Sequence, residues 1–219
     1  MATIKDVPPA EIEAQSFAII EREFEMQTGL PVSRIDPDRF QVIRRVVHAT
    51  GDFEFARSLV FHERSIASAI ASIQSGRDIY IDVSMGAAGI SKKIVHSFGG
   101  AVTCYINDAD VVEKARAAGK TRTETAIEKL SGTDVGIIAV GNAPTALVAA
   151  MALIESNKIR PALVVGVPVG FVNAVESKEI LANQNYPFIT SKGRKGGTPV
   201  AVAIINALLR LALHASERQ

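Results

Sequence analysis

The chain of 219 residues contains no tryptophan and a single cysteine, Cys104. One cysteine excludes an internal disulfide and any zinc site built from several thiolates. Its setting, A-V-T-C-Y-I, is typical of a strand, so we expect Cys104 to be a small buried side chain. The first residues hold an acid by Asp6 and no apolar run. We therefore expect no signal peptide, no membrane-spanning helix and a cytoplasmic location.

Motifs for several common chemistries are also missing. The sequence has no G-x-x-x-x-G-K-[ST] and no G-x-G-x-x-G after a strand, which argues against a nucleotide-dependent enzyme. Its four histidines form no H-x-x-x-H pair, and G-x-S-x-G is absent, so neither a protein-bound metal nor a serine nucleophile is indicated. A net charge of +1 provides no overall basic field, so we expect no nucleic-acid partner.

The chain does have many apolar residues, 47% of the total, arranged in short runs rich in β-branched side chains. Five such runs are candidate strands: 79–83, 101–106, 135–140, 162–165 and, more weakly, 187–190. Most are separated by segments long enough for a crossover helix, which indicates parallel strands with helices on both faces. The sequence thus predicts a three-layer α/β/α fold with a mainly parallel sheet of about five strands.

Three helical segments are expected before the first strand, near residues 9–27, 37–49 and 63–75. They predict an N-terminal helical portion packed on the sheet. The length suits one main core, and no linker rich in proline, glycine or serine divides the chain. We therefore expect a single domain covering residues 1–219.

Glycine and proline gather directly after the predicted strands, where open α/β sheets carry their ligands. Asn142 is a candidate cap for the helix that follows the third strand, and Thr198 for the last helix. The run Thr121 to Glu124 is a capping box, which places Arg122 in the first turn of a helix. Each of these helix starts is a candidate anion site with free N–H groups. Ordinary turn chemistry is the better explanation of any one loop, and only the convergence of the loops on one edge favours a site.

The most informative stretch surrounds His48, at the end of a helix that Asp36 and Pro37 begin and Gly51 terminates. The helix dipole favours a protonated imidazole, whereas nearby arginines disfavour it. A histidine that merely completes a helix end is the alternative. At helical spacing, one stripe holds Gln41, Arg44, Arg45 and His48. A cavity with one histidine, several arginines and many backbone donors suits a large polycarboxylate.

Four ordered motifs resemble one known family. They are R-R-V-V-H-A-T-G at 44–51, G-N-A-P-T-A-L at 141–147, G-V-P-V-G-F-V at 166–172 with E-S-K at 176–178, and G-R-K-G-G-T at 193–198. These runs resemble the precorrin-8X methylmutases of cobalamin biosynthesis, from about Ser16 to the last helix. The resemblance implies an isomerase that moves a methyl group between adjacent carbons of ring C of a tetrapyrrole polycarboxylate. It also implies a homodimer without a cofactor, with neighbouring pathway enzymes as further partners.

Carried over by motif, the catalytic histidine of the family falls on His48, which protonates or hydrogen-bonds the ring C nitrogen. The substrate-contacting residues fall on Ser16, Arg45, Arg122, Asn142 and Thr145. The residues themselves also point to Arg45, Arg122 and Asn142, but not to Ser16, because a serine inside a helix more often bonds back to the preceding turn. Between Asp82 and Gly89 the family pattern is present, but it assigns no role.

Two other functions are consistent with the same residues. One is a non-catalytic tetrapyrrole carrier, in which His48 is only a hydrogen-bond partner. The other is a nucleotide-dependent α/β enzyme, which the missing phosphate motifs disfavour. A change in absorbance during a single turnover distinguishes the isomerase from the carrier, and a titration with ATP or NAD tests the nucleotide enzyme.

Overall fold

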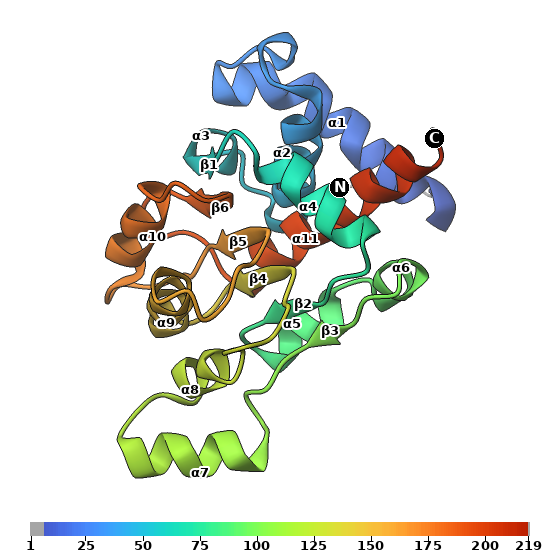
Figure 1. The fold of residues 1–219 in the computed structure, drawn as a ribbon. Helices are drawn as coiled ribbons and strands as arrows, with labels where there is room; N and C mark the ends of the chain where they lie inside the picture. The colour runs from blue at the N-terminus through green and yellow to red at the C-terminus, as the bar shows by residue number, and fades with distance from the viewer. Residues whose placement is uncertain (1–6, 219) are drawn as a thin grey trace.

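The computed structural model describes residues 7–218, which form a six-stranded sheet covered by helices on both faces (Figure 1). The strand order is β1-β6-β5-β4-β2-β3; β1 is antiparallel to β6, and all other neighbours are parallel. The strands are β1 (Leu59–Phe61), β2 (Ile79–Ile81), β3 (Val102–Thr103), β4 (Ile137–Val140), β5 (Leu163–Gly166) and β6 (Phe188–Ser191). The predicted three-layer, mainly parallel α/β/α fold is confirmed.

Successive side chains of each strand point to opposite faces of the sheet. In β4, Ile137 and Ala139 join one buried cluster, while Ile138 and Val140 join the other. The first face is covered by α1 (Ile12–Thr28), α2 (Pro37–Thr50), α4 (Ser65–Gln74) and α11 (Thr198–Ser216). The second is covered by α8 (Arg122–Glu128), α9 (Pro144–Glu155) and α10 (Ala174–Ala182). Because helices cover both faces, β2, β4 and β5 are apolar along their whole length.

Shorter elements complete the chain. They are η1 (Pro9–Glu11), η2 (Val32–Arg34), α3 (Phe55–Ser58), α5 (Ser84–Gly89), α6 (Lys92–Ser97) and α7 (Ala109–Ala118). The helices predicted near 9–27, 37–49 and 63–75 correspond to α1, α2 and α4, so the N-terminal helical portion is confirmed.

The ends of α2 are set by the residues that the sequence indicates. The Asp36 carboxylate accepts the N–H of Arg39 at 3.0 Å, and Pro37 occupies the first turn. At the other end Gly51 has a φ of 66°, a left-handed conformation in which its N–H reaches the Val47 carbonyl at 2.8 Å. These two local features place His48 in the last turn of α2.

Two strand predictions need correction. The sheet has six strands rather than about five, because β1 is an additional three-residue edge strand paired with β6. Such a short segment, lying between two helices, has too few residues to produce a recognisable pattern. The predicted strand at 101–106 is reduced to β3, an edge strand of two residues. Cys104 therefore follows the strand and is half-buried rather than buried.

By length and composition α11 is the one helix among residues 7–218 that could cross a membrane, and buried core helices share these properties. In the fold it is the central helix of the first face, with ten of its side chains from Val200 to Ala212 buried among those of α2 and α4. Its apolar character is explained by this burial, while Arg210 and His214 lie on its exposed side.

Candidate functional site

The first group of predicted site residues gathers around the ring of Phe17, where α1 packs against the last two turns of α2. The His48 ring meets the Phe17 ring edge-on, with 5.3 Å between centroids. The guanidinium carbons of Arg44 and Arg45 lie 4.2 and 5.1 Å from the Phe17 centroid. An aromatic face attracts cations, so Phe17 gathers the three side chains that the helical stripe predicts. We call Glu13, Ser16, Phe17, Arg44, Arg45 and His48 the α1–α2 cluster.

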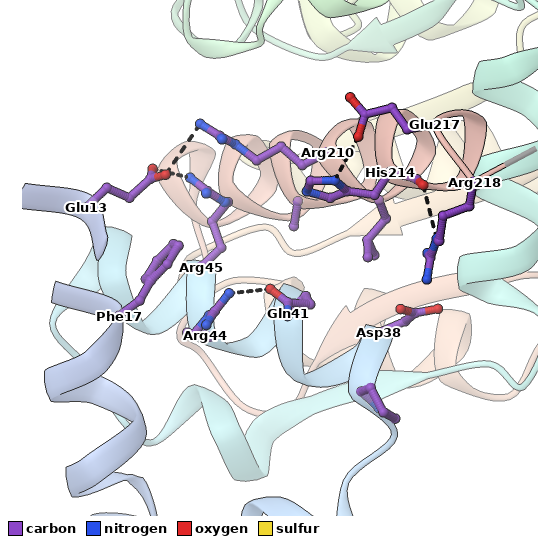
Figure 2. A pocket seen from close by; sticks show the side chains of 13 residues that line it. Glu13, Phe17, Asp38, Gln41, Arg44, Arg45, Arg210, His214, Glu217 and Arg218 are labelled. Atoms are coloured by element: carbon purple, nitrogen blue, oxygen red, sulfur yellow. Dashed lines mark hydrogen bonds and ion pairs between the residues drawn. The ribbon is translucent and has the colours of Figure 1, made fainter. Parts of the chain in front are cut away.

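A crevice of about 530 Å³ opens beside this cluster, between α1, α2 and α11 (Figure 2). Four arginines line it: Arg44, Arg45, Arg210 and Arg218. The exposed His48 imidazole lies outside this lining, at the end of α2.

Acidic groups already occupy part of this basic lining. Glu13 bridges Arg45 at 3.0 Å and Arg210 at 3.5 Å, while Arg44 pairs with Glu21 and Gln41. The hydrogen bond from Arg45 lowers the pKa of the Glu13 carboxyl, with smaller contributions from Arg210 and His48. A ligand carboxylate that binds Arg45 therefore competes with Glu13 or joins it on the same guanidinium.

Ser16 lies on α1 next to Phe17, and its hydroxyl donates to the Ile12 carbonyl at 2.8 Å. This is the back-bond to the preceding turn that is usual for a serine inside a helix. The side chain is half-buried. Its link to His48 is indirect: Ser16 precedes Phe17 on α1, and the Phe17 ring contacts the His48 ring.

The second group of predicted residues lies at the carboxyl ends of the parallel strands. The Thr121 hydroxyl accepts the N–H of Glu124 at 3.2 Å, so the predicted cap is confirmed and Arg122 is in the first turn of α8, exposed. The same hydroxyl lies 3.1 Å from that of Thr145 in the first turn of α9. This bond ties the starts of α8 and α9 together and brings Arg122 close in structure to Thr145.

The predicted cap by Asn142 is wrong. Ala143 precedes α9 without a side-chain cap, the Asn142 side chain is exposed, and the carboxylate of Asp82 at the end of β2 bonds the loop that leads into the helix. Asp82 accepts the N–H groups of Gly141, Asn142 and Ala143 at 3.0, 2.9 and 3.0 Å. These three donors are therefore engaged within the protein, by the buried carboxyl group of Asp82. The loop is thus not the anion site that its glycine and asparagine indicate.

Thr198 is likewise not a cap, because it is the first residue of α11 and Gly197 precedes it. We call Asp82, Arg122, Asn142 and Thr145 the carboxyl-edge cluster. Of its members, the sequence indicates the last three, while the role of Asp82 depends on a contact between residues about 60 positions apart.

A neighbouring loop, residues 192–197, connects the carboxyl edge to the end of α2. Lys195 bonds Asp52 at 2.6 Å and Glu54 at 2.7 Å, in the segment that follows His48. Its carbonyl accepts a bond at 2.8 Å from the ammonium of Lys178, a lysine that is 1% exposed. Burial lowers the pKa of Lys178 to about 8.

The two clusters lie on different parts of the chain. In Figure 1, α1 lies at the top of the view, and α8 lies near the bottom, beyond the sheet. The structure therefore brings Arg45 and His48 to the ring of Phe17, the neighbour of Ser16 in the chain, and it separately brings Arg122, Asn142 and Thr145 to the starts of α8 and α9. Among residues 7–218, no three histidine, cysteine or acidic side chains are grouped so that they could hold a metal ion.

Together these features define a class of protein: an α/β sheet covered on both faces, with an exposed imidazole and clustered arginines suited to a polyanionic ligand. The family model described as precorrin-8X methylmutase matches residues 11–211. The chain belongs to the precorrin-8X methylmutase family, whose members are isomerases that move a methyl group within one molecule.

Individual relatives agree with this assignment. The chain is 42% identical to the cobalt-precorrin-8 methylmutase of Priestia megaterium, over 94% of this chain and 89% of that one. It is 41% identical to the enzyme of the same name from Methanocaldococcus jannaschii, over 92% and 93%. The crystal structure of a precorrin-8X methylmutase from Thermus thermophilus superposes with a TM-score of 0.82 at 36% identity, covering 94% of this chain and 98% of that one.

Proposed function

We propose that this protein catalyses the methyl shift within ring C of precorrin-8X or cobalt-precorrin-8, to give hydrogenobyrinate or cobyrinate. The observation that carries the proposal is the family match along nearly the whole chain, from residue 11 to residue 211. Substrate and product are isomers: one carbon–carbon bond to the methyl group breaks and another forms on the neighbouring ring carbon. The reaction therefore needs no second substrate.

In this proposal His48 is the proton donor to the ring C nitrogen. Its exposed position in the last turn of α2 leaves the imidazole open to a ligand, and Phe17 supports the ring from α1. Ser16 and Arg45 belong to the same contact surface, with Arg45 binding a carboxylate of the macrocycle. Arg122, Asn142 and Thr145 bind the substrate from the carboxyl edge.

We further propose that the active unit is a homodimer in which the α1–α2 cluster of one chain meets the carboxyl-edge cluster of its partner. Two observations support this arrangement. The clusters are apart in a single chain, and exposed apolar side chains lie near both of them. On α1 these are Ile12, Ile19 and Met26, spaced two turns apart; in the loop after β5 they are Val169, Phe171 and Val172. Exposed apolar patches of this kind are typical of interfaces.

The function is tested by following absorbance during a single turnover of the metal-free and the cobalt-containing substrate. We expect the wild type to convert at least one of them to the product isomer. Binding of both without conversion would instead support the tetrapyrrole carrier. Replacing His48 with Asn should lower the rate by roughly 100-fold to 10,000-fold, because a general acid is lost, and should leave the substrate dissociation constant nearly unchanged.

His96 on α6 provides the matched control, since it is also exposed and lies outside both clusters. The His96→Asn variant should keep wild-type turnover. The wild-type rate should be higher at acid than at alkaline pH, because the cationic imidazole is the donor. Normal turnover by His48→Asn, or a rate that climbs with pH, would remove His48 from the donor role.

A further inference from the structure

Asp82 is a fully buried acid directly after β2, and it organises the carboxyl-edge cluster. Its carboxylate accepts the N–H groups of three successive residues after β4, Gly141, Asn142 and Ala143, at 2.9 to 3.0 Å. Its own N–H donates to the Ala139 carbonyl of β4 at 3.1 Å. The carboxylate is therefore fixed to β4 by its backbone, and it fixes in turn the loop that leaves β4.

The three N–H donors favour an ionised carboxylate at this position. Burial outweighs them and raises the pKa of the Asp82 carboxyl, and the donors offset this rise only in part. A carboxylate can accept all three bonds, whereas a protonated carboxyl turns one oxygen into a donor. The positive end of α9 begins directly after the loop, at Pro144, and also favours a negative charge here.

The loop is also confined by the start of α11. A side-chain carbon added at Gly141 would lie 2.8 Å from the backbone of Thr198, at the start of α11. The loop thus has α11 against one side and the Asp82 carboxylate bonded to its N–H groups. Removing the carboxylate releases the loop without offering it another fixed position.

We infer that Asp82 is a positioning residue of the methylmutase site: it fixes residues 141–143 so that the exposed Asn142 and Thr145 side chains face the substrate. This inference rests on the proposed function. Asp82 is buried and does not touch the substrate; it acts through Asn142 and the start of α9.

The test replaces Asp82 with Asn, which keeps the shape but turns an NH₂ donor toward backbone N–H donors. We expect KM to rise roughly 10-fold to 100-fold with a smaller change in kcat, because the loop binds the substrate while His48 carries the proton. Asp78 gives a matched control, since it accepts the Ala101 N–H at 2.8 Å from the opposite end of the same strand. Asp78→Asn should lower stability without changing KM.

A double-mutant cycle with Asn142→Ala shows whether Asp82 acts through Asn142. We expect the effects of Asp82→Asn and Asn142→Ala on KM to be strongly non-additive. Additive effects, or a KM equal to that of the wild type in Asp82→Asn, would overturn the inference. If Asp82→Asn does not fold, Asp82→Glu carries the test, because it keeps the charge but moves the oxygens by one methylene; an unchanged KM there would also overturn it.

Amide hydrogen exchange separates failure of this inference from failure of the proposed function. In Asp82→Asn, the amides of Gly141, Asn142 and Ala143 should exchange faster than in the wild type, while those of β5 should not change. An inactive wild type would refute the methylmutase proposal. Unchanged exchange at residues 141–143 would refute the role of Asp82, whether or not the wild type is an active methylmutase.

Discussion

Lys178 is a buried lysine whose acid–base chemistry departs from its ordinary behaviour. Its side chain is 1% exposed, and its ammonium donates to the Lys195 carbonyl and the Ser191 hydroxyl, at 2.8 and 3.3 Å. Both partners are uncharged oxygens, so burial is the main influence and lowers the pKa of Lys178 to about 8. The folded protein therefore releases this proton more readily than the unfolded chain.

This lowered pKa predicts a pH dependence of stability. Between pH 8 and about 10.5 the unfolded chain holds more protons at Lys178 than the folded protein, so the contribution of Lys178 to the free energy of unfolding rises with pH. Below pH 8 both states are protonated, and the cost of burying the charge is present in full. Urea unfolding of the wild type and of Lys178→Met, from pH 7 to 10, measures this.

We expect the stability of the wild type to increase relative to Lys178→Met as the pH rises through this window. Lys192→Met is the matched control, because Lys192 is exposed in the same loop region. A constant difference between wild type and Lys178→Met across the window would contradict the lowered pKa.

Among the elements, the end of α2 depends on a loop from the other end of the chain. Lys195 bonds both Asp52 and Glu54 in the segment after α2, and its hydrogen bond lowers the pKa of the Asp52 carboxyl. Lys178 and Ser191 hold the Lys195 carbonyl on the opposite side. The loop therefore connects β6 to the turn that follows His48.

Replacing Lys195 with Met should raise KM, because the loop then no longer holds the turn that follows His48. The melting temperature should change only slightly, because exposed ion pairs add little to folding. The small loss in melting temperature should be largest at low salt and should disappear at high salt. It should also shrink as the pH falls through the pKa of Asp52, since that carboxylate contributes its stabilisation only while ionised. Kinetics and thermal unfolding of Lys195→Met beside Lys192→Met measure both effects; a loss of melting temperature that persists at high salt would contradict this account.

At the scale of the whole molecule, the separation of the two clusters predicts a site shared between chains. Arg45→Ala and Arg122→Ala should each form homodimers with weakened substrate binding, since each loses a charged partner for a carboxylate. A mixed dimer keeps one intact site if Arg45 of one chain works with Arg122 of the other. Co-expression of the two variants should then restore about a quarter of wild-type activity, because half of the dimers are mixed and each has one of two sites.

Light scattering on the same samples gives the oligomeric state. A monomer at micromolar concentration would contradict the dimer. Dimers that regain no activity on co-expression would show that each site lies within one chain.

Local features of the sequence determined much of this protein. Asp36, Pro37 and Gly51 define α2 because a cap and a terminator act on backbone groups only a few residues away. The β-branched runs predict the parallel strands for the same reason, since burial on both faces requires apolar residues throughout. The cap at Thr121 and the stripe of Arg44, Arg45 and His48 are also local.

Only the tertiary structure decided which residues act together. Asp82 meets Gly141 because β2 and β4 are neighbours in register, and this contact removed the anion site expected at Asn142. The packing of α1 on α2 placed Phe17, the neighbour of Ser16 in the chain, against His48, and Lys178 was buried against the end of β6. A carboxylate, a hydroxyl or an ammonium has no fixed partner in the sequence. Its role depends on which distant donors and acceptors the fold brings within about 3 Å, and local pattern does not carry that information.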